Sequence, residues 1–255
     1  MRIYRDNLID YAATVISAAS EGADLPASNV RDPDRNNVYR TGTSAAAEWL
    51  KFDLGSAKAV LAVILLDHTL AAGDSAIYLQ GNDTDVWTAP TVNSAITFNA
   101  GTVIHHLGAS ATHRYWRVIF TKSAAGETRD IGRVFLGSYD EMTRGPKIPD
   151  GLDITPVDLS QTSRALGGKT HSEIRGQYDQ IGIDFPPIGD AQMELLKALA
   201  ASCGTHTPFF VSIDPTNKPY DLLYYVKAKS LKARKVKLWG SAPAWDAALD
   251  LNEEI

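Results

Sequence analysis

The chain has 255 residues, of which 44% are hydrophobic and 22% charged, and its formal net charge is −5. This balance is typical of a soluble globular protein, and the length suits two domains. Neither half of the chain is basic, which argues against nucleic-acid binding through bulk charge. We expect no cleaved signal and no membrane span, because no apolar stretch of sufficient length is present. A single cysteine, Cys203, excludes an internal disulfide.

The segment 48–68 carries the clearest strand signal. Leu50, Phe52 and Leu54 alternate with their neighbours, which predicts a half-buried strand, and a second, buried strand is predicted at 60–66 after a turn at Gly55. Residues 114–120 alternate in the same way. Shorter strands are expected at 12–18, 75–80, 96–98 and 103–107. The first half of the chain is therefore predicted to be a β domain.

Four sequence phrases in this half resemble a known family. They are Trp-Leu-Lys-Phe-Asp-Leu-Gly (49–55), Leu-Asp-His-Thr-Leu (66–70), Arg-Tyr-Trp-Arg-Val (114–118) and the closing strand 131–137. In this order they are similar to discoidin (coagulation-factor C-type) domains, in particular the copies found in phage minor tail proteins. The resemblance covers about residues 3–139 and implies a galactose-binding-like jelly roll. Thr69 stands where those copies usually have Asn.

Such jelly rolls place ligand contacts in loops at one end of the sandwich. Candidate ligand-binding residues in the corresponding loops are Asp34, Asn36, Asn37, Tyr39, Arg40, His68 and Asp74. The loop 32–37 also carries oxygen ligands that calcium could use, but it lacks the regular alternation of a calcium loop, which favours a solvated loop. We therefore predict no metal site.

The second half follows a Gly-, Pro- and charge-rich stretch, which predicts a linker at 140–152 between domains at 1–139 and 153–255. Ile181, Ile183 and Phe185 alternate as in a strand. Asp190 and Gly204 then bracket a helical stripe, with Asp190 as the expected N-cap, and the helix is predicted at about 191–202. Strands are expected at 208–213, 222–228 and 244–251. The fold class is predicted as mainly β, a jelly-roll β-sandwich followed by a β-sandwich or barrel with one helix.

The layout of this half resembles the tail-tube-like domain of phage distal tail and baseplate-ring proteins. The matching pieces are the helix after the Ile-x-Phe strand, the phrase at 208–215 and the closing strand 245–254. The resemblance implies a homo-oligomeric ring, with a hexamer favoured, in the tail tip or baseplate of a virion assembled in the bacterial host cytoplasm. It also implies tube, hub, tape-measure and receptor-binding proteins as partners.

A basic run follows in the expected strand region: Lys227, Lys229, Lys232, Arg234, Lys235 and Lys237. Alternation puts several of these charges on one strand face. Two interpretations remain open at this point, a solvated hairpin or an electrostatic contact with a neighbouring subunit.

No catalytic motif is present. The Gly-Gly-Lys-Thr tetrad at 167–170 lacks the upstream glycine of a phosphate-binding loop, which favours a polar turn. We expect neither enzymatic activity nor a cofactor. The predicted function is that of a structural tail-tip ring component that presents a jelly roll for docking receptor-binding proteins or host surface glycans. The alternative is a carbohydrate-binding module protein that is not part of a virion.

Overall fold

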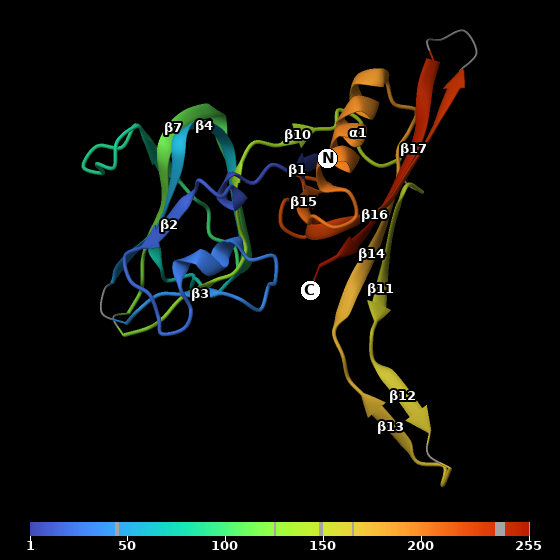
Figure 1. Cartoon of the computed structure of the whole chain (residues 1–255), viewed down its shortest axis with the longest axis horizontal. Coiled ribbons are helices and arrows are strands. Elements are labelled where there is room, and N and C mark those ends of the chain that lie inside the picture. The colour runs from blue at the N-terminus through green and yellow to red at the C-terminus, as the bar shows by residue number, and fades with distance from the viewer. Residues whose placement is uncertain (44–45, 125, 148–149, 165, 238–242, 255) are drawn as a thin grey trace. The chain divides into compact units, whose positions relative to one another are not determined.

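The computed structural model describes residues 1–43, 46–124, 126–147, 150–164, 166–237 and 243–254. The chain divides into two compact units, Asp6–Tyr139 and a second unit made of Met1–Arg5 together with Asp140–Ile255. It is mainly β, as predicted, and Figure 1 shows the strands and the helix α1. No described helix is both long and apolar enough to cross a lipid bilayer.

The first unit is a β-sandwich in which two long strands serve both layers. β4 (Ala47–His68) and β7 (Gly101–Thr121) pair antiparallel along most of their length, with register shifts between Asp53 and Lys58 and between Val60 and Ala62. Gly55 adopts φ +73° at this bend, a conformation that glycine reaches without strain. The predicted strands at 48–54 and 60–66 are thus the two arms of one bent strand, visible in Figure 1.

Shorter strands complete both layers. The order β2-β4-β7-β5-β6 forms one sheet path, and β9 pairs with the second arm of β4. The strand expected at 96–98 lies instead at Val92–Ala95. The remaining elements of this unit are η1 (Leu8–Asp10), β2 (Val15–Ala18), η2 (Ala27–Arg31), β3 (Tyr39–Arg40), β5 (Ser75–Asn82), β6 (Val92–Ala95), β8 (Asp130–Ile131) and β9 (Val134–Gly137).

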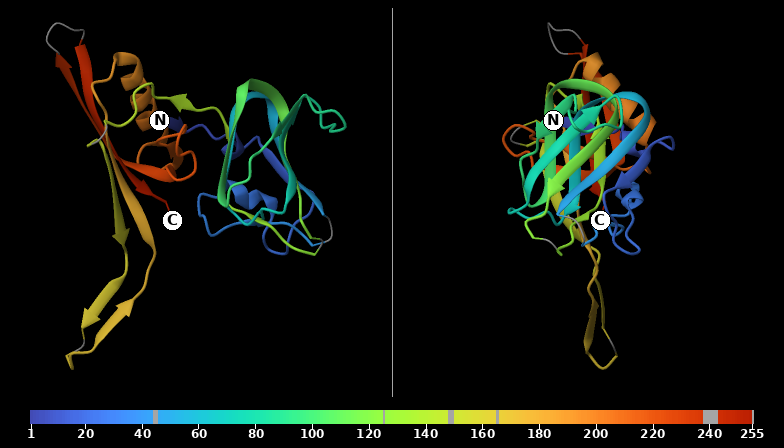
Figure 2. Two further views of the ribbon diagram at one scale, coloured as in Figure 1. Left: turned by 180° about the vertical axis from the view of Figure 1, so that it is seen from behind. Right: turned by 90° about the vertical axis from the view of Figure 1, so that its left-hand side faces the viewer.

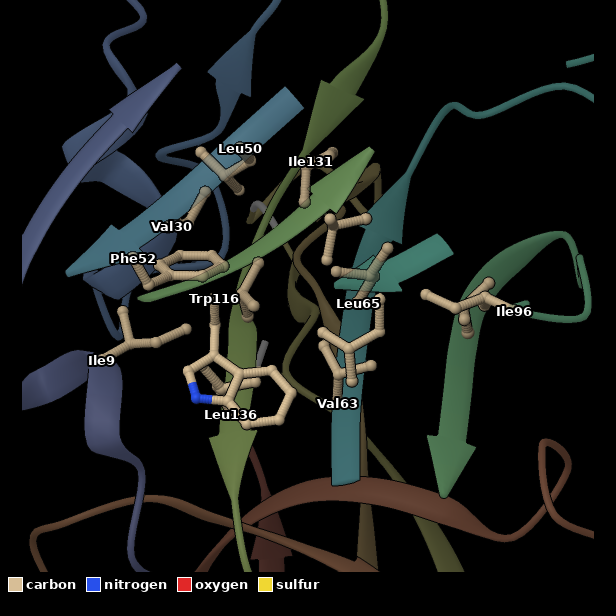
Figure 3. Close-up of a cluster of buried hydrophobic side chains, with 14 of the residues drawn as sticks. Ile9, Val30, Leu50, Phe52, Val63, Leu65, Ile96, Trp116, Ile131 and Leu136 are labelled. Carbon is tan, nitrogen blue, oxygen red and sulfur yellow. The ribbon is translucent and has the colours of Figure 1, made fainter. Parts of the chain in front are cut away.

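The core of the sandwich is formed by the inward-facing residues of the alternating strands. Leu50 and Phe52 on β4 pack with Trp116 on β7, and all three are fully buried (Figure 3). Val63, Leu65 and Leu136 come from the other layer. Because neighbouring strand residues point to opposite faces, the intervening residues of β4 and β7 face away from this core.

The second unit is one antiparallel sheet with a helix against it. Its strand order is β10-β1-β15-β16-β17-β14-β11. Its elements are β1 (Arg2–Tyr4), β10 (Asp140–Glu141), β11 (Leu152–Asp158), β12 (Gln161–Arg164), β13 (Thr170–Glu173), β14 (Gln177–Asp184), α1 (Asp190–Cys203), β15 (Phe209–Ser212), β16 (Leu223–Lys237) and β17 (Pro243–Glu253). The helix buries Met193, Leu196, Leu199 and Cys203 in the core of this unit.

The predicted helix is confirmed, but its first cap is not the predicted one. Gly189 is the N-cap and makes no side-chain cap bond, while Asp190 is the first helical residue and accepts a hydrogen bond from Trp245 Nε1 at 2.6 Å. Gly204 caps the other end with φ +55°. The Asp190 carboxylate, which the sequence predicts as the helix cap, is therefore hydrogen-bonded to Trp245, a residue outside the helix.

The first unit ends at Tyr139, and the structure departs from the expected division at residues 1–5 and in the expected linker 140–152. Residues 1–5 belong to the second unit, where β1 lies between β10 and β15, with Ile3 opposite both Asp140 and Val211. The predicted linker is also part of this unit at its start, because β10 pairs with β1 and Met142 is buried. The chain thus passes between the units twice, and the first unit is an insertion between the paired strands β1 and β10.

Candidate functional site

The predicted ligand loop after η2 is exposed and internally hydrogen-bonded. Asp34 Oδ1 accepts from the backbone N–H of Asn36 at 3.0 Å and from its side-chain amide at 2.9 Å. These bonds lower the pKa of Asp34 below its usual value. Asn37 donates to Asp32 Oδ2 at 2.9 Å. The loop is an Asx turn whose polar groups are largely engaged with one another.

Three other predicted ligand residues lie inside the fold. Tyr39 is fully buried and its hydroxyl donates to Ser20 O at 2.8 Å. His68 is 5% exposed, and its Nδ1 accepts from Leu70 N at 3.2 Å. The carboxylate of Asp74 accepts from Arg129 Nε and Nη2 at 2.7 and 2.9 Å. A buried side chain offers a ligand almost no surface, so these residues support the loops instead of contacting a ligand.

Arg40 lies at the surface but its guanidinium is engaged. Its Nε and Nη2 donate to the two oxygens of Asp130 at 2.6 and 2.7 Å, a bidentate pair that joins β3 to β8. Thr69, at the position where the resembling domains usually have Asn, accepts from Asp130 N through its hydroxyl at 2.7 Å. Each predicted residue is therefore engaged in a local hydrogen bond or ion pair, and Asp34, Asn36 and Asn37 are the exposed members of the set.

A different surface of the same unit gathers aromatic and basic side chains. On the outward face of the sheet, Trp49 lies opposite Ile119, and Ile119 lies opposite Tyr78. In the next row Lys51 lies opposite Arg117, which in turn lies opposite Gln80. Trp87, from the loop after β5, stacks on the Arg117 guanidinium at 4.3 Å from its carbon to the ring centroid. We call this surface, made of Trp49, Lys51, Tyr78, Trp87, Arg117 and Ile119, the aromatic face.

Sequence reasoning missed most of this surface. The alternation of 48–54 and 114–120 was readable, and it already assigned Trp49, Lys51 and Arg117 to the faces opposite the core. What the sequence lacked was the register, which decides that Lys51 and Arg117 are direct neighbours. The contact of Trp87 with Arg117 depends on the path of the loop after β5, which the sequence does not predict.

The basic run in the second unit is largely neutralised by its own hairpin. Lys227 pairs with Glu254 at 2.6 Å, Lys232 with Asp250 at 3.2 Å and Arg234 with Asp246 at 3.4 Å. Lys235 lies over the ring of Trp245, 5.4 Å from its centroid. Lys229 borders a polar hollow with Asp250 and Asn252; Lys237 ends β16, and its side chain lies outside the described part. Exposed pairs of this kind contribute little to stability and favour the solvated hairpin.

The most exposed part of the second unit is a two-stranded ribbon. β12 and β13 pair antiparallel and every residue of both strands is exposed. Figure 2 shows this ribbon continuing beyond β11 and β14, away from the helix and the body of its sheet. Leu166 at its turn is fully exposed and Ile174 is 89% exposed. The Gly-Gly-Lys-Thr tetrad lies at this turn and at the start of β13, as predicted for a polar turn.

Within the described ranges, no group of three or more His, Cys, Asp or Glu side chains is placed to hold a metal ion. Cys203 is buried in the core of the second unit, with its Sγ 3.6 Å from the Ser202 hydroxyl oxygen.

Comparison with known proteins gives structural neighbours only. No family model matches the sequence, and no curated protein matches it. Among solved structures, a fucosidase from Ruminococcus gnavus matches over 55% of this chain and 28% of its own, with 11% identity and a TM-score of 0.46. Chitosan-binding module 1 of a Paenibacillus chitosanase/glucanase matches over 54% of this chain and its full length, with 19% identity and a TM-score of 0.43. A Streptococcus pneumoniae fucose-binding module matches over 52% of this chain, with 15% identity and a TM-score of 0.42.

Proposed function

We propose that the chain is a structural, non-catalytic subunit of a ring at the distal end of a phage tail, in which the second unit builds the ring and the jelly roll is a display module. The observation that carries this proposal is the uncovered ribbon β12–β13. An isolated two-stranded hairpin is at best marginally stable in water. A ribbon with no covering layer is therefore best explained by a contact that a neighbouring chain supplies.

The side chains of the ribbon support a protein contact. Leu166 and Ile174 have 111% and 89% relative exposure, and burying an aliphatic side chain contributes roughly 1.5–3 kcal/mol. Pro156 lies within the edge strand β11 and has no N–H to donate, which opposes simple strand addition along that edge. The faces and the tip of the ribbon are thus better suited to the contact than its edge.

A second copy of the chain fits this role. An apolar hollow of about 250 Å³ lies between α1 and the strands β16 and β17, lined by Leu196, Leu199, Leu231 and Leu249 among others. An aliphatic ribbon tip in this hollow would join two different surfaces of the chain. Such head-to-tail contacts close into rings when the rotation allows it. The sixfold stoichiometry comes from the tail-tube-like resemblance.

The proposed setting is the virion tail tip, with tube, hub, tape-measure and receptor-binding proteins as partners. In a ring, several jelly rolls would be presented together, and weak contacts of each copy would add through avidity. The display module would then dock a receptor-binding protein or a host surface glycan. Both uses gain strength from the ring through avidity, so the ring is the part to test first.

Size-exclusion chromatography with light scattering of the full chain and of three variants tests the proposal. In the first variant an Asn-Gly turn replaces residues 159–176 and joins Asp158 to Gln177, which form the last pair of β11 and β14. The second is Leu166→Asp, and its matched control is Thr162→Asp on the same exposed ribbon. We expect closed rings for the full chain and the control, and monomers with unchanged circular dichroism for the other two. A full chain that is monomeric at tens of micromolar and within purified particles would rule out the ring.

The alternative of a carbohydrate-binding protein outside a virion is favoured by one observation, the partly exposed aromatic rings of the aromatic face. Aromatic rings with one solvent-exposed face can stack on sugar rings. A strictly monomeric chain that binds glycans, and that mass spectrometry does not find in purified phage particles, would establish this alternative.

A further inference from the structure

Lys51 and Arg117 are two like charges placed next to each other on the sheet, an arrangement that is unfavourable without nearby negative charge. They occupy directly opposed positions on β4 and β7 and face the same side. Directly opposed residues in antiparallel strands have their Cβ atoms about 5 Å apart, and like charges at such positions are destabilising. Asp85 is the carboxylate between them: it accepts from Lys51 Nζ at 2.6 Å and from Trp87 Nε1 at 2.7 Å. Asp53, the other carboxylate on this face of β4, is held in a bidentate pair by Arg114, so Lys51, Arg114 and Arg117 together exceed the two carboxylates by one positive charge.

Arg117 has unused hydrogen-bonding capacity. Its Nε donates to Gln80 Oε1 at 2.7 Å, and Gln80 in turn donates to Asn93 Oδ1 at 2.9 Å. This chain of bonds and the stacking on Trp87 hold the guanidinium plane in place. Across the described residues, the two terminal nitrogens have no hydrogen-bond acceptor. Burial lowers the pKa of Arg117, with Asp85 opposing the shift, in agreement with a partly desolvated and incompletely compensated cation.

The surroundings of this cation are flat and aromatic. Trp49 and Tyr78 flank it in the neighbouring row across Ile119, and each is partly exposed. Because this is the face of a sheet whose strands are already paired, an extended peptide has no backbone edge to join here. A ring-shaped ligand with an apolar face and a pendant anion fits the combination of aromatic planes and a fixed guanidinium.

We propose that the aromatic face of the jelly roll is a binding site for an acidic sugar, whose carboxylate pairs with the terminal nitrogens of Arg117 while its ring packs on Trp49 or Tyr78. This site differs from the loops at the end of the sandwich, where the predicted ligand residues are engaged in structural pairs. The inference names the ligand class of the display module and so rests on the proposed function. Its test uses monovalent ligands, so its outcome does not depend on whether the ring forms.

Isothermal titration calorimetry of the full chain compares two pairs of probes that differ in charge. The pairs are trigalacturonate against its methyl ester, and 3′-sialyllactose against lactose. We expect the acidic member of at least one pair to bind, and its neutral counterpart to bind about tenfold or more weakly, because charge-assisted hydrogen bonds to Arg117 are lost. Equal binding of acid and neutral probe, or no binding of any of the four, overturns the proposal.

Variants locate the site. Arg117→Gln and Trp49→Ala are expected to weaken binding about tenfold or more while circular dichroism stays unchanged. Lys58→Gln, an exposed lysine at the bend of β4, is the control for the same change in net charge and is expected to bind as the parent. Arg40→Gln probes the loop end of the sandwich. If Arg40→Gln loses binding while Arg117→Gln keeps it, the proposed site is refuted. Binding of an Asp/Glu-rich peptide through Arg117, with no acidic sugar bound, refutes the ligand class.

Discussion

Lys122 Nζ lies 3.1 Å from Glu48 Oε1, and neither side chain has any exposed surface. The pair is completed by Ser20, whose hydroxyl is 2.8 Å from both carboxylate oxygens, and by Gly42 O, which accepts from Lys122 at 2.8 Å. Two charges are therefore buried at the loop end of the jelly roll and are compensated entirely by the fold.

Removing one partner of this pair is expected to be costly. Lys122→Met leaves the Glu48 carboxylate buried without its counter-ion, which costs about 3–5 kcal/mol in comparable cases. The double variant Lys122→Met with Glu48→Leu should recover much of this loss, because no isolated charge remains. Urea denaturation followed by tryptophan fluorescence measures both. A loss below about 1 kcal/mol for the single variant would contradict the assignment.

Asp74 predicts a stability change in acid. Burial alone would raise the pKa of this carboxyl, but hydrogen bonds from Arg129, Ala71 and Ser123 outweigh it and hold the pKa well below its usual value. A depressed folded-state pKa stabilises the fold above the unfolded-state pKa of about 3.9, and this contribution is lost as the pH falls below that value. Asp74→Asn should therefore be less stable at pH 7 and lose less stability between pH 5 and pH 2. Parallel pH curves for parent and variant would disprove this role.

His68 predicts a second pH effect, nearer neutrality. Burial lowers its pKa, and the Leu70 N–H that donates to Nδ1 requires the neutral ring at that nitrogen. The unfolded chain takes up this proton near pH 6.5, so the contribution of His68 to stability is present above that pH and falls as the pH is lowered. His68→Asn, whose amide oxygen can accept the same bond, should flatten the stability curve between pH 7.5 and 5.5. The exposed His171 provides the control, since His171→Asn should leave the curve unchanged.

The insertion of the jelly roll predicts two different deletion phenotypes. Removing residues 1–139 also removes β1, whose Ile3 is 1% exposed between β10 and β15. Joining Arg5 to Asp140 by a short turn removes the jelly roll and keeps β1, and the Arg5–Asp140 ion pair of 2.6 Å shows that the two ends lie close together. We expect the second deletion to give a folded protein with the thermal transition of the second unit. The first should aggregate or unfold at a clearly lower temperature.

Alternation was sufficient to predict the strands that build the cores. The arms of β4, the second half of β7 and the helix α1 each have a buried stripe of the right period, so their residues could be assigned from the sequence. β1 has three residues and shows no period, and its partners are more than a hundred residues away, so its place in the second sheet could not be inferred. The strands β12 and β13 of the ribbon are polar and exposed along their whole length, so their extension beyond the sheet has no local signal.

The candidate site was harder to predict than the fold, because the partners of its side chains are distant in the sequence. Polar residues in the loops of the jelly roll suggested a ligand site, but Asp74 and Arg40 form ion pairs with Arg129 and Asp130, which lie far away in the sequence. Composition cannot distinguish a carboxylate that is available to a ligand from one that is already in an ion pair within the protein. The reverse holds for Arg117: among the described residues its terminal nitrogens have no acceptor, and Asp85 accepts hydrogen bonds from Lys51 and Trp87 instead.

The double crossing between the two units has a consequence for the effect of proteolytic cleavage. A protease that cuts between Arg5 and Asp6 leaves the jelly roll covalently attached through Tyr139 and Asp140. A cut at that second crossing leaves it joined to β1, which remains hydrogen-bonded between β10 and β15. One nick therefore does not release the module, whereas a domain fused at a chain end is lost with a single cleavage.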